Sequence, residues 1–496
     1  MKLTKSLLLG TAAGLIAVGG AQAADLPLKA KAVEYVKICS LYGAGYYYIP
    51  GTDTCIKLGG YVRADMVLGG AGDYGFQNST SSANGGSNNR LTNYYYSRAR
   101  LDLNIDTRTA TEYGVVRTYA DMVFTYDSAN VTGSNPSAFS TSSPSLGLYH
   151  AFIQFAGFTF GRTVSIFDAP WQSYPAGGPD TIPGGSNNVT GINQVAYTAD
   201  FGQGITASVA VQDMTSTSGG QSNLWNLSGA TAANMVQGVY GTNSWGGTRS
   251  PDIVGQVRVD QAWGLAQLSV AAHELHASYY GANEATGHPS DKWGWAIQGA
   301  LSIKNIPTGP GDSINLQAVY TDGASRYNFQ NLFPQSFFMY GSTGVSGAYQ
   351  SVGFAGVADG VFTTGSSIET VKTWGFRAGY SHNWSPNWAS GVYGGYASLS
   401  YGSAGKTAIC ANAVSLLGFV GSCNPDFNFA VAGVNTVWTP VKNLSFTADL
   451  SWSHLDQKYS GTIVSPGVST AAKPAAVYEL KDQNSISMLL RAQRNF

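Results

Sequence analysis

Charged side chains are scarce in this 496-residue sequence, where Asp, Glu, Lys and Arg make up only 11% of the residues. Long hydrophobic runs are missing as well. Beyond residue 23 no segment offers the 18 apolar residues that a membrane-spanning helix needs, and the stretch 413–421 is interrupted by Ser415. These absences exclude a helical membrane protein. The mean hydropathy is nevertheless close to zero, at -0.06, because Gly, Ser, Thr, Asn and Tyr supply the polarity, so a soluble secreted protein remains open on composition alone.

Histidine is also rare, with six residues, and the signals of an enzyme are weak. His273, His276 and His288 run from an expected strand end into a loop without cysteine, so we expect no metal site and no cofactor. The glycine-rich stretches 43–51 and 69–75 lack the lysine of a phosphate-binding loop. The sequence therefore predicts that the protein is not an enzyme.

Residues 1–23 have the pattern of a secretory signal peptide. Lys2 and Lys5 form the positive region, residues 7–18 the apolar core, and residues 21–23 the small-residue cleavage site. Without those two lysines, 25 basic residues stand against 28 acidic ones, so the exported chain, which begins at Ala24, has a formal charge near -3. That charge is too small to argue for nucleic acid, and we expect no such partner.

The four cysteines all lie in the exported part, where disulfides are permitted. Three connectivities are possible in principle. We favour the two local ones, Cys39 with Cys55 and Cys410 with Cys423, because the first pair precedes the first expected strand and the second lies within one expected loop. By closing a loop in the unfolded chain, each disulfide would stabilise the folded state by roughly 3 kcal/mol.

The last twelve residues alternate as a strand does when one of its faces is apolar and the other polar. Apart from Arg494, every even-numbered residue from Ile486 to Phe496 is apolar. A lipid-facing arginine this close to the strand end costs only ~0 to 1 kcal/mol, against ~2 to 4 at the bilayer midplane. A tilted strand of this length can cross a membrane. The terminal Phe496 resembles the signal by which outer-membrane barrel proteins are recognised, so we expect the barrel-assembly machinery as a partner.

The same alternation recurs from residue 56 onward and predicts sixteen strands, an even number as a closed antiparallel barrel requires. The expected strands are 56–68, 95–105, 116–125, 148–155, 158–162, 192–199, 205–212, 253–260, 265–273, 292–303, 314–321, 374–381, 388–399, 427–438, 444–453 and 485–496.

Short and long connections alternate along this series. This pattern is typical of an outer-membrane barrel and is not expected of a soluble β-sandwich. The expected short links include 107–114 and 156–157, and the third long link is 163–191. Tryptophans in or beside the short links fit an aromatic girdle at the membrane interface. They are Trp263, Trp384, Trp388 and Trp438.

The expected inner face is polar, and about sixteen strands are enough to enclose an aqueous channel. Its basic residues gather on four neighbouring strands, because closure places the last strand beside the first. They are Arg63, Arg98, Arg100 and Arg491 near mid-height, and Arg117 lower down. Asp65, Asp102 and Asp121 are interleaved with them, so salt bridges within the wall are the alternative role for these arginines.

Three stretches resemble the alphaproteobacterial outer-membrane porins. Residues 155–162 followed by 165–168 look like the run into the constriction loop of that family, residues 33–63 resemble its opening with both cysteines, and residues 491–496 match its closing. The resemblance implies a homotrimeric general-diffusion pore whose third long loop folds inward. We expect Asp168 and Asp180 on that loop to face the arginines across the constriction. The unusually long loops 213–252 and 322–373 depart from the family pattern.

We therefore expect an all-β fold, a transmembrane antiparallel barrel of about sixteen strands over residues 55–496, with short periplasmic turns and long extracellular loops. Residues 24–54 would form an N-terminal segment on the periplasmic side. The protein would lie among the lipids of a Gram-negative outer membrane and pass small hydrophilic solutes and ions passively. Two rival hypotheses remain: a barrel with a plugged lumen that acts as an adhesin or structural anchor, and a barrel hydrolase, whose Ser, His and carboxylate would have to converge in space.

Overall fold

The computed structural model describes residues 37–69, 89–90, 95–128, 130–131, 139–140, 144–171, 182–216, 221–329 and 336–496. The chain forms two compact units, of which the first ends at Ile56 and the second begins at Lys57.

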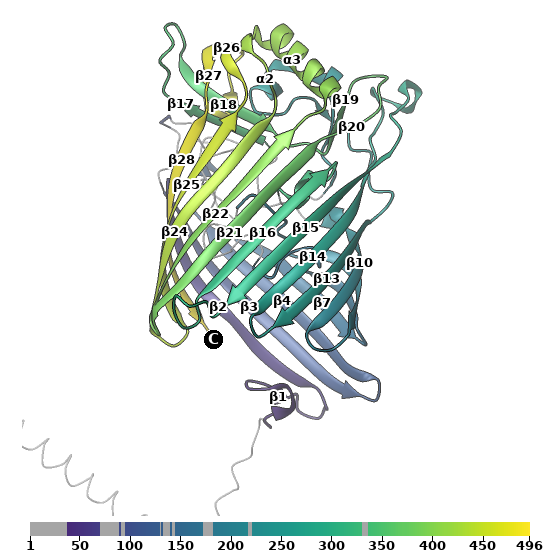
Figure 1. Cartoon of the computed structure of the whole chain (residues 1–496), viewed down its shortest axis with the longest axis vertical. Coiled ribbons are helices and arrows are strands. Elements are labelled where there is room, and N and C mark those ends of the chain that lie inside the picture. The colour runs from purple at the N-terminus through teal and green to yellow at the C-terminus, as the bar shows by residue number, and fades with distance from the viewer. Residues whose placement is uncertain are drawn as a thin grey trace, which may run out of the picture. The chain divides into compact units, whose positions relative to one another are not determined.

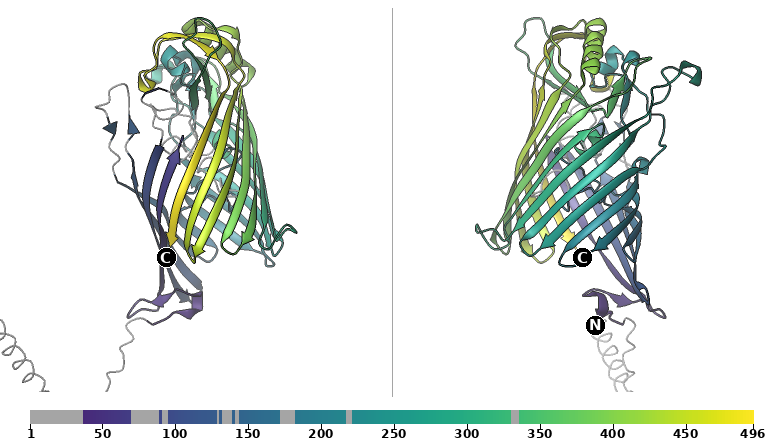
Figure 2. Two further views of the ribbon diagram at one scale, coloured as in Figure 1. Left: turned by 90° about the vertical axis from the view of Figure 1, so that its left-hand side faces the viewer. Right: turned by 45° about the vertical axis from the view of Figure 1, so that its right-hand side comes forward.

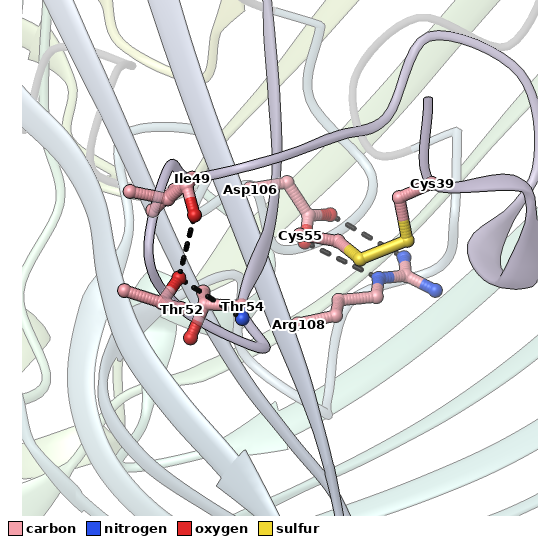
Figure 3. Close-up of a disulfide and its surroundings, with 7 residues drawn as sticks. All are labelled: Cys39, Ile49, Thr52, Thr54, Cys55, Asp106 and Arg108. Atoms are coloured by element: carbon pink, nitrogen blue, oxygen red, sulfur yellow. Dashed lines mark hydrogen bonds and ion pairs between the residues drawn. A yellow bond between two sulfur atoms is a disulfide. The ribbon is translucent and has the colours of Figure 1, made fainter. Parts of the chain in front are cut away.

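The first unit is a small disulfide-closed loop. It contains the short helix η1 (Ser40–Tyr42) and the strand β1 (Tyr47–Tyr48), in which Tyr48 pairs with Cys55. Cys39 and Cys55 are joined by a disulfide and are both buried, with their Cα atoms 6.0 Å apart (Figure 3). The hydroxyl of Thr52 donates to the carbonyl oxygen of Ile49 at 3.0 Å and tightens the intervening turn. The first predicted disulfide is therefore confirmed.

The second unit is a closed antiparallel barrel of sixteen strands, and every predicted strand is present (Figure 1). Each strand pairs with its sequence neighbours in the wall, and the ring closes where Asp65 of the first strand pairs with Arg491 of the last. The wall strands are β2 (Cys55–Leu68), β3 (Tyr95–Thr111), β4 (Gly114–Asp127), β7 (Ser145–Phe155), β8 (Phe158–Thr163), β9 (Ile192–Asp200), β10 (Ile205–Asp213), β13 (Asp252–Gln261), β14 (Gly264–Leu275), β15 (Lys292–Lys304), β16 (Ser313–Asp322), β21 (Lys372–Ser385), β22 (Trp388–Ser400), β24 (Phe427–Val441), β25 (Leu444–Gln457) and β28 (Gln483–Asn495).

The two faces of the wall follow the alternation in the sequence. In β15, exposed Trp295 and Ile297 alternate with buried Ala296 and Gln298. The exposed face is apolar, as a lipid-facing surface must be, and aromatic residues gather near both rims. Trp384, Trp388 and Trp438 are exposed beside the short turns, and Trp293, Trp295 and Trp374 are exposed near the long loops. Among the described residues, no helix is both long and apolar enough to cross a membrane.

One short link is shorter than predicted. The sequence predicts a connection over residues 107–114, but β3 continues to Thr111 and only Glu112 and Tyr113 form the turn. The predicted boundary was wrong: the polar threonines and arginines at this end of the hairpin belong to the strand. β-Branched threonine suits a strand, and Thr107 pairs directly with Thr118 across the ladder.

The described parts of the long loops after residue 213 form a cap above one rim of the barrel, and α3 lies in this cap (Figure 1 and Figure 2). Buried aromatic residues from several loops share one core, among them Tyr240, Phe337, Phe354 and Tyr459. Cys410 in α3 is joined to Cys423, so the second predicted disulfide is confirmed. The cap elements are η2 (Met214–Ser216), β11 (Leu224–Asn226), η3 (Leu227–Gly229), α2 (Ala232–Met235), β12 (Thr242–Asn243), η4 (Glu284–Thr286), η5 (Ser325–Tyr327), β17 (Ser336–Gly341), β18 (Gln350–Gly356), β19 (Gly360–Phe362), β20 (Glu369–Thr370), α3 (Ser403–Leu417), β23 (Val420–Ser422), β26 (Ser460–Ser465), η6 (Ser469–Ala471) and β27 (Ala476–Leu480); a two-stranded hairpin, β5 (Asn130–Val131) and β6 (Phe139–Ser140), lies in the second long loop.

Candidate pore constriction

The described parts of the third long loop, residues 164–171 and 182–191, lie inside the barrel and are held there by a row of inward-facing glutamines. The Gln194 amide donates to the Val164 carbonyl oxygen at 2.7 Å, and the Gln256 amide donates to that of Ile166 at 2.7 Å. Side-chain amides suit this task because each offers two donors to the backbone carbonyls of a loop that has no strand partner. We call these residues the glutamine row: Gln194, Gln212, Gln256, Gln267, Gln298 and Gln317, one from each of the strands β9, β10, β13, β14, β15 and β16.

Two buried arginines hold the returning half of the loop. Arg377 on β21 is fully buried, and its guanidinium donates to Gln317 at 2.9 Å, to the Ile182 carbonyl oxygen at 3.3 Å and to that of Ser186 at 2.6 Å. Arg326 in η5 donates to the Asn188 amide oxygen at 2.9 Å. The rigid fork of a guanidinium can bind several carbonyl oxygens at once.

Gly184 brings this half of the loop into close contact with the wall. Its φ is +97°, and a Cβ atom there would lie 2.2 Å from the carbonyl oxygen of Phe376. Only glycine combines this backbone conformation with so close an approach.

Asp168 lies in the hydrogen-bond network of the loop itself. Its carboxylate accepts from the backbone N–H of Asn188 at 2.6 Å and from the Asn188 side chain at 3.1 Å, and the residue is only 5% exposed. Burial raises the pKa of this carboxyl, while hydrogen bonds from Ser186 and Asn188 and the charges of Arg326 and Arg377 act in the opposite direction. Asp168 thus ties the start of the loop to its end. Asp180 lies outside the described residues.

The five predicted arginines lie on β2, β3, β4 and β28, which are neighbours in the ring. Three of them form ion pairs with wall carboxylates: Arg98 with Asp127, Arg117 with Asp106 at 2.7 Å and Arg491 with Asp65 at 2.7 Å. Arg63 donates to Gln493 at 2.7 Å, and Arg100 donates to Thr125 at 3.1 Å. Together these residues form an arginine strip along one side of the lumen, partly neutralised by the wall.

A cluster with the arrangement of a hydrolase triad is formed by Ser222, His273 and Asp252, with the histidine between the other two. Ser222 Oγ lies 2.8 Å from His273 Nε2, and His273 Nδ1 lies 2.7 Å from Asp252 Oδ1. Ser222 Oγ also lies 2.9 Å from the carbonyl oxygen of Glu274, which competes with the imidazole for the single hydroxyl hydrogen. Asp252 also accepts from the hydroxyl of Tyr327 at 2.6 Å. The serine and the carboxylate thus each have a second hydrogen-bond partner, and all three residues are buried within the wall and the cap.

Comparisons with known proteins identify the family. The profile of the family described as "Porin subfamily" matches residues 25–489. This chain belongs to that porin subfamily. Porin Omp2b of Brucella suis biovar 1 (strain 1330) and Porin Omp2b of Brucella abortus (strain 2308) are each 32% identical to the porin over 307 residues, which cover 61% of this chain and 75% of the relative. The outer membrane channel DcaP of Acinetobacter baumannii shares the fold, with a TM-score of 0.56 at 16% identity over 90% of this chain and 99% of the other.

The predicted family, the sixteen-stranded barrel, the channel function and the Gram-negative outer membrane as location are thereby confirmed. Residue-level reasoning missed the glutamine row, Arg326 and Arg377. A signal for the row was present, because each expected strand between residues 192 and 321 carries one inward glutamine. No comparable signal marks the two arginines, because their partners in the inward loop are more than 130 positions away in the sequence.

Proposed function

We propose that the porin is a passive diffusion channel for small hydrophilic solutes and ions, whose narrowest part lies between the inward loop and the arginine strip. The observation that carries the proposal is that the arginine strip and the anchored loop lie on opposite sides of the ring. The strip lies on β28, β2, β3 and β4, whereas the loop is anchored on strands from β9 to β21. The middle strand of that second span, β14, is eight strands from β2 in a ring of sixteen. Asp180 on the loop would supply the acidic side, whereas the carboxylate of Asp168 is buried and bound by Asn188.

A single charge cannot decide which ions pass. One unit charge about 10 Å from a permeating ion is worth only ~0.4 kcal/mol in bulk water and ~1.7 kcal/mol at an effective dielectric near 20. Several charges of one sign on one wall add up to a larger field across the lumen. The proposal therefore predicts a collective effect.

Planar-bilayer recording of the triple variant Arg63→Ser, Arg98→Ser, Arg100→Ser tests the proposal. The reversal potential in a salt gradient should shift toward cation preference, because the carboxylates beside these arginines remain. Arg249→Ser is the matched control, since that side chain is 63% exposed in a long loop. An unchanged reversal potential in a folded triple variant would show that the strip does not line the constriction. Absence of any ohmic current in the wild type would favour the plugged adhesin or anchor.

We also propose that the porin is not an enzyme, and the burial of the triad-like cluster supports this proposal. Ser222, His273 and Asp252 are 4%, 2% and 1% exposed, and the carbonyl oxygen of Glu274 competes with His273 for the hydroxyl hydrogen of the serine. A fluorophosphonate probe that labels Ser222 in the folded protein would overturn this proposal.

We also propose a homotrimer that buries the low part of the wall. β8 has six residues, which span about 20 Å even before tilt, whereas a strand that crosses a bilayer needs about 9–11. Phe158, Phe160 and Tyr197 are exposed there and form one aromatic cluster, with ring centroids 5.7 and 4.9 Å apart. Mass measurement in detergent should give three chains, and a monomer would contradict the proposal.

The remaining proposals concern export. The mature chain would begin at Ala24, with residues 24–54 on the periplasmic side, and the barrel would be inserted among outer-membrane lipids by the barrel-assembly machinery. N-terminal sequencing of the purified porin tests the cleavage site, and a start at Met1 would contradict it.

A further inference from the structure

A cavity of about 530 Å³ lies directly beneath the start of the inward loop, on the short-turn side. Its walls come from the inward faces of β9, β10 and β13, and its roof is the loop segment 164–170. The volume falls within the range of small-molecule sites, which is roughly 300–1,000 Å³.

The charged side chains of the cavity are already bound by other groups. Its lining holds Arg258 and the carboxylates of Asp168, Asp200 and Asp260. Arg258 donates to Asp260 at 2.7 Å, and Lys304, which is outside the lining, lies 3.8 Å from the same carboxylate. Asp200 accepts from the N–H of Gly202 at 2.8 Å, and Asp168 accepts from that of Asn188. An anionic solute is therefore disfavoured, and the bound carboxylates can still accept hydrogen bonds from hydroxyl groups of a solute.

The remaining lining is amphipathic. Thr198 and Ser208 are paired on the neighbouring strands β9 and β10 with their hydroxyl oxygens 2.9 Å apart, and Thr206 adds a third hydroxyl. The roof offers hydrocarbon from Ile166, Ala169 and Pro170 beside the polar Ser165 and Asp168. Hydroxyl groups can serve as donors or acceptors by rotation, so this wall adapts to hydroxyls on a solute while the roof covers its C–H face.

We propose that this cavity is a weak binding station for a neutral polyhydroxylated solute, such as a monosaccharide or a small polyol. The inference rests on the proposed diffusion function and adds a solute class to it. An apolar solute would displace water from the hydroxyls and the charged side chains without offering hydrogen bonds in return, which is unfavourable.

Single-channel recording with glucose and sorbitol, added to the short-turn side at constant salt, tests the proposal. Each should reduce the open-channel current or add noise in a saturable way. The double variant Thr198→Val, Ser208→Ala should raise the half-effective concentration at least fivefold. Ser390→Ala, Thr436→Val is the matched control and should respond as the wild type does, because it removes a hydroxyl pair of the same kind, 3.3 Å apart, elsewhere in the wall. Heat-modifiable gel mobility verifies that both variants fold.

The outcomes separate the two proposals. A wild-type channel that conducts salt but shows no saturable response to either sugar overturns the binding station and leaves the diffusion function standing. A stronger response to gluconate or glucosamine than to glucose overturns the neutral class. No salt current at all in the wild type contradicts the diffusion function itself.

Discussion

At the residue scale, the inward loop depends most on Arg377. This side chain is fully buried and connects the wall to two carbonyl oxygens of the loop, those of Ile182 and Ser186. An unsatisfied buried polar group costs about 1–3 kcal/mol, so removal of the guanidinium weakens the attachment of residues 182–188 from several sides at once.

We expect Arg377→Met to increase the single-channel conductance and its fluctuations, because the loop becomes free to leave its position in the lumen. The measurement is planar-bilayer recording, with Arg249→Met as the control for loss of a loop arginine. A folded Arg377→Met porin with the steady conductance of the wild type would contradict the assigned anchoring role.

Lys473 gives the cap a dependence on pH. Its ammonium donates to Gln350 at 2.5 Å and lies 4.4 Å from the centre of the Tyr340 ring, and burial lowers its pKa to about 8 from 10.5. The folded state therefore binds fewer protons than the unfolded state between those two pH values. The free energy of unfolding of the cap should rise as the pH is raised from about 8 toward 10.5.

Thermal melting at pH 7.5 and pH 10, followed by tryptophan fluorescence, measures this effect. The wild-type cap should melt at the higher temperature at pH 10, and Lys473→Met should reduce the difference between the two pH values. Equal shifts in both proteins would assign the pH dependence to other groups.

The sequence predicted some residues well and others not at all. Both disulfides followed from local spacing, and the position of the arginines on neighbouring strands followed from closure of the ring. The partners of the arginines did not, because the choice of Asp127 for Arg98 or Gln493 for Arg63 depends on register between strands. The contacts of Asp168 depend on how a loop without period returns on itself.

At the scale of elements, the cap behaves as a folded layer built from loops. α3 packs Ile409, Ala413 and Leu417 into the shared aromatic core, and the disulfide from Cys410 to Cys423 closes this segment. The wall strands could be predicted from the alternation in the sequence because one face meets lipid and the other faces the lumen. The fold of the cap could not be predicted, because its core joins loops that are far apart in the sequence.

Loss of the cap disulfide should loosen the cap and leave the barrel intact. Cys410→Ser with Cys423→Ser removes a closure worth roughly 3 kcal/mol, so a protease should cut residues 401–426 faster, while the channel still conducts. The control is Cys39→Ser with Cys55→Ser, which removes the disulfide of the first unit and should not change cleavage of 401–426. Loss of conductance in a folded cap variant would show that the cap disulfide supports the wall.

At the scale of the whole molecule, the ring is sealed by its last strand. The backbone N–H of Phe496 donates to the carbonyl oxygen of Gly60 at 3.1 Å, while its side chain is 58% exposed. The residue thus contributes to closure and to the outer surface without reaching the lumen.

Deletion of Phe496 should lower the yield of assembled barrel without changing the conductance of the molecules that do assemble. Heat-modifiable gel mobility measures the folded fraction, and Phe496→Tyr, which keeps a terminal aromatic ring, should restore most of it. Equal folded yields for the deletion and the wild type would rule out the assembly role.

The seam between β2 and β28 also determines when this chain is vulnerable. Of the sixteen wall strands described, only β2 and β28 are neighbours without following each other in the order of the wall strands along the chain, and the ion pair between them joins residues 426 positions apart. Contacts at such separation form slowly, and until they form the sheet has two unpaired edges that can pair with other chains. The period of aggregation risk therefore begins when the first hairpins appear and ends only with the final residue. Faster expression, by raising the number of unsealed chains present together, should increase loss through aggregation more steeply than it increases yield.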